Sequence, residues 1–147
     1  RPSKRPRRYR GDMAVFKLDI VTPERTVFTG SVESLQAPGS QGSFGVLARH
    51  APMIAAMKVG ALGFIEEGSN EPRSLACSGG FVEVGGDGVI VLAEAAEFGD
   101  QIDRTRATAA QERAQERLNQ RDGVVDAARA EIALARALNR LRIAGGD

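Results

Sequence analysis

The sequence contains few of the residues that bind metals or crosslink chains. Its 147 residues include one cysteine, Cys77, and one histidine, His50. A single cysteine cannot form a disulfide within the chain, which is typical of proteins from a reducing compartment. A cysteine and a histidine so far apart, with no second Cys or His nearby, also make a poor ligand set for zinc or copper. The sequence therefore predicts neither an internal disulfide nor a metal site.

Long apolar stretches are missing as well. No run approaches the roughly 20 residues that cross a bilayer, and no apolar segment of a secretory signal stands near the start. The apolar share of 42% is nevertheless ordinary for a soluble protein, and a chain of this length normally forms one domain with or without a smaller appendage. We expect a packed core and no transmembrane segment.

The net charge of +1 hides an uneven distribution. Residues 1–12, RPSKRPRRYRGD, hold six of the 20 basic residues and one of the 19 acids, which leaves a net charge of −4 in the rest. A segment so rich in proline and arginine has too little apolar surface to fold, and Met13 directly after it resembles a natural chain start. We expect a disordered basic extension or tag remnant at 1–12. The remainder has no basic patch, so no nucleic-acid partner is predicted.

From Phe16 to about Glu97 apolar residues recur with a period of two, which is typical of half-buried strands. Glycine-rich turn signals such as Gly60 and residues 78–80 separate these stretches. The expected strands are Phe16–Ile20, Thr26–Thr29, Val32–Gln36, Val46–Leu47, Met53–Val59, Leu62–Glu66, Arg73–Cys77, Phe81–Val84 and Val89–Ala93. Many short strands at this spacing predict an antiparallel sandwich or flattened barrel. We place this N-terminal domain at residues 13–97.

After Gly99 the period changes, and alanine, arginine and glutamate, which favour helices, dominate. The sequence predicts an αα-hairpin in a second domain at residues 98–147, with its turn in NQRDG at 119–123. Three sets of residues each share one helical face. They are Ala107, Ala110, Ala114 and Leu118 in the first helix, and Leu134, Leu138 and Leu141 as well as Ala128, Ile132 and Ala135 in the second.

Alanine dominates the predicted helical stripe. Each buried alanine removes little apolar area from water, so at ~25 cal/mol per Å² the helices gain less from packing than a leucine seam would give. One hypothesis is that the hairpin opens or repacks when a ligand or partner binds. The alternative is a stable alanine-rich hairpin fixed on the sandwich.

The stretch GSQGSFGVLARHAP at residues 39–52 contains glycines at a spacing of three. It matches neither the GxxxxGK[ST] loop that binds phosphates nor the GxGxxG of dinucleotide-binding domains. The glycines instead indicate tight turns and positive φ at the sandwich edge. His50 is interpreted as a structural or contact residue, because no catalytic spacing links it to Ser43 or Asp103. A small hydrolase is therefore not predicted.

Arginines are spaced regularly along both predicted helices. Arg106 and Arg113 lie two turns apart, and Arg136 and Arg140 are separated by four residues, so each pair shares a face. In a closed hairpin the four guanidiniums would converge and would repel one another unless an anion such as a polyphosphate lay among them. Asp103 at the start of the first helix suits the positive end of its dipole. A solvated charged face is the alternative.

Four segments together carry a family resemblance. They are GSQGSFGVLARHAPMIAAMKVG at 39–60, SGGFVEV at 78–84, VIVLAEAAE at 89–97 and IDRTRA at 102–107. In this order they resemble the epsilon subunit of bacterial F-type ATP synthase, which is equivalent to the mitochondrial delta subunit, over residues 13–143. The resemblance implies a flattened ten-stranded antiparallel β-sandwich followed by a C-terminal αα-hairpin.

The resemblance also implies a function. Members of this family are non-catalytic central-stalk subunits that couple the gamma subunit to the c-ring during proton-driven ATP synthesis. Their helices can extend into the alpha/beta catalytic head and inhibit ATP hydrolysis. The implied location is peripheral, on the cytoplasmic face of the bacterial plasma membrane. A free-standing nucleotide-binding sensor domain remains the alternative from another class.

Site residues follow from the resemblance position by position. The 39–52 stretch resembles the surface that meets the c-ring, with Gly42, Ser43, Phe44 and His50 as contacts. The residue before Phe44 is often acidic in relatives, so Ser43 puts an ionic contact with the ring in doubt. In the extended state, acidic residues of the beta subunits would meet Arg129, Arg136, Arg140 and Arg142.

Some bacterial relatives bind ATP through a motif similar to I-D-x-x-R-A, which Ile102, Asp103, Arg106 and Ala107 match. No cofactor is required for the implied function, and ATP is expected only as a regulator. The acids of this site would face the adenine and the arginines the phosphates. The implied nucleotide contacts are Glu97, Asp103, Arg106, Ala107, Arg113, Arg136 and Arg140.

Overall fold

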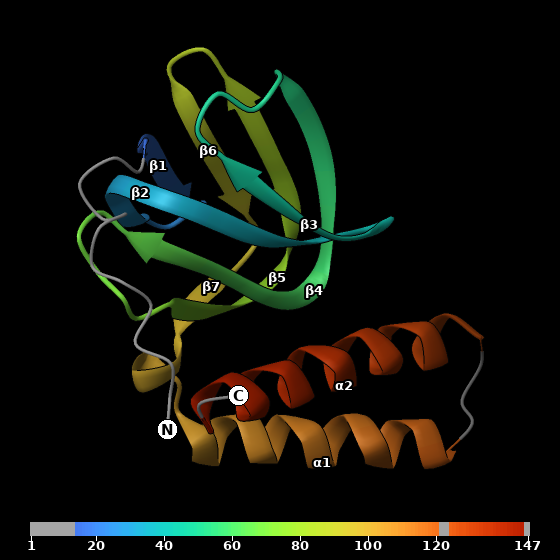
Figure 1. Cartoon of the computed structure of the whole chain (residues 1–147). Helices are drawn as coiled ribbons and strands as arrows, with labels where there is room; N and C mark the ends of the chain where they lie inside the picture. Colours follow the sequence, from blue (N-terminus) through green and yellow to red (C-terminus); the bar gives the residue numbers. More distant parts are fainter. Residues whose placement is uncertain (1–13, 121–123, 146–147) are drawn as a thin grey trace, which may run out of the picture.

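The computed structural model describes residues 14–120 and 124–145. The expected basic extension at 1–12 and most of the expected NQRDG turn lie outside the described residues. A β-sandwich and a helical hairpin form the two parts of the molecule, and the hairpin lies along one side of the sandwich (Figure 1). The predicted order of a β domain followed by two helices is therefore observed.

Within residues 14–120, seven strands form one sheet that closes on itself. The strands are β1 (Phe16–Val21), β2 (Thr26–Gly39), β3 (Gly42–Leu47), β4 (Met53–Glu66), β5 (Arg73–Gly85), β6 (Gly88–Ala93) and β7 (Ala96–Phe98). The hydrogen-bonded order is β1-β6-β5-β4-β2-β3, with β7 on β5, and β1 also pairs with β2. All pairs are antiparallel except the parallel pair of β1 and β6. The predicted sandwich fold is confirmed.

The strand count of seven differs from the ten that the resemblance implied and from the nine that the turn signals predicted. Three long strands continue through glycines where breaks were expected, and β7 was not among the predicted strands. β2 passes Gly30 and pairs first with β1 and then with β3 and β4, so it belongs to both layers. β4 likewise runs through Gly60. In β5, Gly80 has φ +119°, and a Cβ there would lie 2.0 Å from the Leu92 carbonyl oxygen. Glycine thus lets the strand bend between layers while it keeps its hydrogen bonds.

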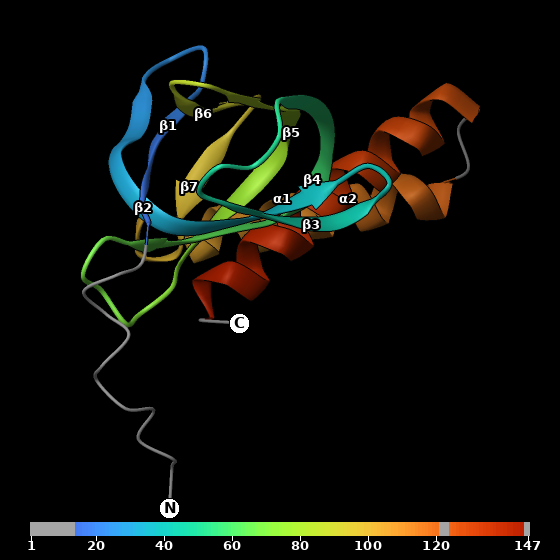
Figure 2. The ribbon, with the colours of Figure 1, turned by 45° about the horizontal axis from the view of Figure 1, so that its top comes forward.

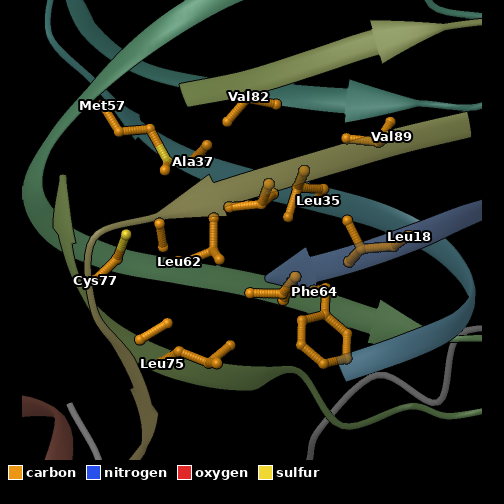
Figure 3. Close-up of a cluster of buried hydrophobic side chains, with 14 of the residues drawn as sticks. Leu18, Leu35, Ala37, Met57, Leu62, Phe64, Leu75, Cys77, Val82 and Val89 are labelled. Atoms are coloured by element: carbon orange, nitrogen blue, oxygen red, sulfur yellow. The ribbon is translucent and has the colours of Figure 1, made fainter. Parts of the chain in front are cut away.

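The core lies inside the closed sheet. Leu18, Leu35, Leu62, Leu75 and Val82 are at most 1% exposed, and their side chains point toward one another from β1, β2, β4 and β5 (Figure 3). These are the inward positions of the period-two pattern. Burying each such side chain contributes about 1.5–3 kcal/mol, so the sandwich forms a stable platform for the hairpin.

The helices follow a short connection. The 3₁₀ turn η2 (Gly99–Gln101) leads into α1 (Arg104–Gln120), and α2 (Val124–Ala144) returns antiparallel to it. α2 lies between α1 and the sheet, where it packs against β4 and β5 (Figure 1). In both views the far end of the hairpin projects beyond the sandwich (Figure 2).

The buried face of α1 is the predicted one, whereas that of α2 is not. Ala107 and Ala114 are buried in α1, with Ala110 and Leu118 half-buried. In α2, however, Ile132 and Leu138 are 50% and 46% exposed. Ala128 and Ala135 are also exposed, while Leu134 and Leu141 are half-buried. From Asp126 to Ala144, the buried residues of α2 are Ala130, Ala137, Asn139 and Ile143. Because α2 packs against both α1 and the sheet, it buries residues on two faces, and these are not the two predicted sets.

Candidate functional site

A pocket of about 600 Å³ lies where the sandwich meets α1. Its lining residues come from the turn between β1 and β2, from the stretch between Ala95 and the third turn of α1, and from α2, which contributes Arg140. Its size is in the range of small-molecule sites. Six of the seven implied nucleotide contacts line it, and they are Glu97, Asp103, Arg106, Ala107, Arg113 and Arg140.

The start of α1 sets the positions of its two pocket arginines. The Oδ1 of Asp103 accepts a hydrogen bond from the Arg106 backbone N–H at 3.0 Å and so caps the helix. Arg106 therefore lies in the first turn, and Arg113 follows two turns later on the same side, about 10 Å along the axis. Ala107 and Ala110, which lie between these two arginines in the sequence, also line the pocket. Their side chains are small and occupy little of its volume.

One charge pair crosses the pocket from the sandwich to α2. Arg140 Nε lies 2.8 Å from Glu97 Oε1, with the side chains 29% and 34% exposed. The pocket as a whole is lined by four arginines, Arg25, Arg106, Arg113 and Arg140, and by three acids, Glu24, Glu97 and Asp103. Among the described residues, Arg25, Arg106 and Arg113 form no ion pair. The site therefore carries cationic groups suited to a phosphate-bearing ligand.

Arg136, the seventh implied nucleotide contact, lies outside this pocket. Its Nη2 is 3.2 Å from Glu94 Oε2, and its buried Nε makes no hydrogen bond within the part of the chain that the structure describes. The expected convergence of Arg106, Arg113, Arg136 and Arg140 is thus incomplete. Arg25, which the sequence did not single out, is the fourth guanidinium instead.

A buried asparagine fastens α2 to the sheet. Asn139 is 6% exposed, and its Nδ2 donates to the main-chain oxygens of Gly60 at 2.9 Å and Cys77 at 3.4 Å. These two acceptors are partners in the β4–β5 ladder. The Oδ1 of Asn139 accepts from Arg142 Nη2 at 2.9 Å. The only sequence signal for this contact was a polar amide among the alanines and leucines of the helix.

Three of the four arginines implied to contact beta subunits already have partners within the chain. Arg136 pairs with Glu94, Arg140 with Glu97, and Arg142 donates to Asn139. Arg129 is exposed. In the docked hairpin, then, most of this basic face is occupied by contacts with the sandwich or within α2.

The four residues implied to meet the c-ring fall at opposite ends of β3. Gly42, with φ +123°, and Ser43 begin the strand, and Phe44 packs against the core. Ser43 Oγ accepts from Gln36 Nε2 at 2.9 Å and donates to the Ala37 oxygen. His50 follows the other end, beyond a six-residue strand that spans roughly 16–20 Å. The expected loop at 39–52 therefore contains a strand, and the four predicted contacts are divided between its two ends.

The outer face of β4, β5 and β6 carries exposed apolar side chains. Ile54 is 73%, Phe81 53% and Leu92 49% exposed. Phe81 lies opposite Leu92 in the β5–β6 ladder, and Glu83 stands between Ile54 and Ile90. We call Ile54, Phe81, Ile90 and Leu92 the outer apolar patch. Contiguous apolar residues of this kind mark surfaces that meet another protein.

The described residues contain neither a cluster of metal-ligating side chains nor a membrane-spanning helix. Residues 14–120 and 124–145 contain no group of three or more His, Cys, Asp or Glu side chains placed to hold a metal ion. No helix within those ranges is both long and apolar enough to span a bilayer.

Cys77 is buried in the core, and this burial raises the pKa of its thiol to about 11. A thiol in this state is a poor nucleophile near neutral pH.

Comparisons of the sequence identify the family of both parts. Residues 15–99 match "ATP synthase, Delta/Epsilon chain, beta-sandwich domain", and residues 100–145 match "ATP synthase, Delta/Epsilon chain, long alpha-helix domain". The ATP synthase epsilon chain of Desulforamulus reducens is 47% identical over 128 residues, which cover 87% of this chain and 96% of that one. The epsilon chain of Moorella thermoacetica is 47% identical over 133 residues, covering 90% and 98%.

Solved structures share the fold. A chain of the Euglena gracilis mitochondrial ATP synthase, solved with OSCP, F1 and c-ring, superposes with a TM-score of 0.75 at 24% identity, over 91% of this chain and 82% of that one. A chain of the Tetrahymena thermophila central stalk and c-ring gives 0.59 at 16% identity, over 86% and 94%. The interpretation as a non-catalytic ATP synthase subunit agrees with these matches. The chain belongs to the delta/epsilon family of ATP synthase subunits.

Proposed function

We propose that this chain is the central-stalk subunit that couples the gamma subunit to the c-ring, and that its hairpin inhibits ATP hydrolysis unless ATP holds it docked. One observation carries the regulatory part of this proposal. Six implied nucleotide contacts from the sandwich, α1 and α2 line a single pocket. Because the walls belong to separate segments, the pocket exists in this form only while the hairpin lies on the sandwich.

A ligand of this pocket stabilises the docked state by mass action. ATP that binds the docked form alone lowers its free energy by about 2.7 kcal/mol at a concentration of 100 times Kd. The arginines Arg106 and Arg113, which form no ion pair in the described residues, would meet the phosphates. ATP abundance would then set the fraction of molecules whose hairpin is free to inhibit.

Extension of the hairpin would release the basic face of α2. Arg136 and Arg140 would leave Glu94 and Glu97, and acidic residues on the beta subunits would take their place. The acidic residues of the sandwich and those of the beta subunits thus compete for the same two guanidiniums. The docked and extended positions of the hairpin are therefore mutually exclusive.

The sandwich would make the permanent contacts of the stalk. The β3–β4 connection that contains His50 lies at the end of the sandwich away from the hairpin (Figure 1), and we assign this end to the c-ring. We assign the outer apolar patch to gamma, because exposed Ile54 and Phe81 need a partner surface. In a bacterial cell these contacts put the chain at the cytoplasmic face of the plasma membrane.

A free-standing nucleotide sensor is the second candidate, and the pocket formed within this one chain favours it. The outer apolar patch counts against a solitary protein. Copurification separates the two functions, because a stalk subunit comes with gamma and a sensor comes alone. Replacing Phe81 by serine should abolish copurification with gamma, whereas replacing the equally exposed Ile132 of α2 should not.

Calorimetric titration of ATP into the full chain tests the regulatory part. Arg106→Ala should raise Kd at least tenfold, since it removes a charge-assisted contact worth about 1.5–3 kcal/mol. Arg140→Ala should also raise Kd, since it leaves the Glu97 carboxylate unpaired in the pocket. Arg117→Ala is the matched control, because this exposed arginine of α1 does not line the pocket. No binding up to millimolar ATP would contradict ATP gating and leave the stalk role intact.

A further inference from the structure

The turn between β1 and β2 forms a wall of the pocket that neither the motif nor the helical spacing indicated. Thr22, Glu24 and Arg25 line the same cavity as Arg106 and Arg113. This turn belongs to the sandwich, while the implied phosphate-binding arginines belong to the hairpin. The cavity is therefore lined both by the start of α1 and by a segment that is far from it in the sequence.

Local hydrogen bonds fix the shape of this turn. The Thr22 backbone N–H donates to the Arg25 oxygen at 2.9 Å. The Thr22 hydroxyl donates to the same oxygen at 3.2 Å and accepts from the Arg25 N–H at 3.3 Å. Pro23 restricts its own φ as well. The main chain of Arg25 is thus held from several directions, and only its side chain remains free to adapt to a ligand.

The charges of the pocket leave Arg25 available to an anion. Arg140 is paired with Glu97, and the Asp103 carboxylate caps α1. In the described ranges the guanidinium of Arg25 forms no ion pair and no hydrogen bond to another side chain. Arg25 is exposed, so a bound phosphate could be reached without first breaking an existing pair.

We propose that Arg25 is a specificity-determining residue of the pocket, which contacts the polyphosphate of the nucleotide from the sandwich side. This inference rests on the proposed nucleotide function. The inference bears on how the hairpin is held, because α2 lies between α1 and the sheet (Figure 1). A ligand that contacts both Arg25 and Arg106 connects α1 directly to the sandwich. ATP then fastens the hairpin to its platform in addition to holding the two helices together.

Calorimetric titrations of the full chain with ATP and with AMP test this assignment. Arg25→Ala should raise the Kd for ATP five- to tenfold and should change the Kd for AMP at most twofold, because AMP lacks the outer phosphates. Arg25→Lys keeps the charge and should recover part of the loss. Arg117→Ala removes the same charge from an exposed helical site outside the pocket and should have no effect. Circular dichroism melts check that all variants fold.

The outcomes separate this inference from the proposed function. If Arg106→Ala weakens binding while Arg25→Ala binds ATP as tightly as Arg117→Ala does, the role of Arg25 is refuted and the nucleotide pocket stands. If Arg25→Ala weakens ATP and AMP equally, its assignment to the polyphosphate is wrong. If the unaltered chain binds no ATP, both the pocket function and the role of Arg25 fail.

Discussion

Arg140 Nε lies 2.8 Å from Glu97 Oε1, and this contact joins α2 to the last strand of the sandwich. Both side chains are about two-thirds buried, whereas Glu94 in the neighbouring pair with Arg136 is 64% exposed. Solvent screens an exposed pair more strongly than a half-buried one. The two ion pairs that hold the docked hairpin are therefore unequal, and the inner pair at Glu97 should dominate.

Replacing the inner acid should loosen the hairpin measurably. We expect Glu97→Gln to lower the opening free energy of α2 by about 1 kcal/mol, near the upper end for partly exposed pairs. Glu94→Gln, the matched control, should lower it by no more than a few tenths. Native-state hydrogen exchange of the α2 amides measures both changes. Equal effects of the two substitutions would contradict the ranking.

Asn139 should contribute more than either ion pair, because it is buried. Asn139→Ala leaves the oxygens of Gly60 and Cys77 without this donor, and a lost buried hydrogen bond costs about 1–3 kcal/mol. Asn139→Asp should cost still more, since a carboxylate would face two carbonyl oxygens. Hydrogen exchange should speed up in both helices and stay unchanged in the sandwich strands.

The control for Asn139 is Asn119, an exposed asparagine near the end of α1 whose Oδ1 accepts a hydrogen bond from Gln115 Nε2 at 3.4 Å. Asn119→Ala should leave hairpin exchange within twofold of the unaltered chain. In an assembled ATP synthase, Asn139→Ala should also strengthen inhibition of hydrolysis, because it frees the hairpin. Unchanged exchange in Asn139→Ala would show that apolar packing alone holds α2 in place.

Much of the fold follows from the sequence because periodicity reports burial directly. The alternation from Phe16 onward predicted the sandwich, and the change of period after Gly99 predicted the hairpin. Glycines that were interpreted as turns led to too many predicted strands, since Gly30 and Gly60 lie inside bent strands rather than between strands. For α2 neither of the two predicted sets matches the buried residues, because a helix packed on two sides buries residues on both.

The site residues that the family resemblance supplied could be named from the sequence, and those that tertiary packing alone adds could not. The helix start at Asp103 and the arginine Arg106 came from one short segment of sequence. Arg25 joins them through the closure of the sheet, and Asn139 meets the carbonyls of two strands that are distant in the chain. Spacing along one element carries no information about such contacts, because tertiary packing alone brings them together.

Arg73 is predicted to stabilise the base of the sandwich through three aromatic rings. Its guanidinium carbon lies 4.1 Å from the Phe98 ring centroid and 5.6 Å from that of Phe64, and its Nη1 is 2.8 Å from Glu66 Oε1. Arg73→Ala should lower the free energy of unfolding by about 1–2 kcal/mol. Arg73→Lys should lower it by less, because lysine keeps the positive charge and loses only the stacking of the planar guanidinium. Urea denaturation measures both changes, with Arg117→Ala expected to change stability by under about 0.5 kcal/mol.

Cys77 links stability to alkaline pH. Burial raises the pKa of its thiol from 9.0 to about 11, and nearby Glu94 adds to this effect. Between pH 9 and pH 11 the thiol of the unfolded chain loses its proton while that of the folded chain keeps it. The contribution of the protonated thiol to the free energy of unfolding is therefore intact below pH 9 and is lost as the pH rises toward 11. The loss should reach roughly 2 kcal/mol by pH 10.5. Urea denaturation from pH 7 to 10.5 should show it in the unaltered chain and not in Cys77→Ala.

The same thiol also tells hairpin opening apart from sandwich unfolding. Cys77 points into the sandwich core (Figure 3), whereas its neighbour Ala76 packs against Ile102 and Ile143 of the hairpin connection and α2. Successive strand residues face opposite sides, so an undocked hairpin exposes Ala76 and leaves Cys77 covered. A thiol reagent at pH 8 should therefore label Asn139→Ala as slowly as the unaltered chain. Faster labelling of that variant would mean that the sandwich opens together with the hairpin.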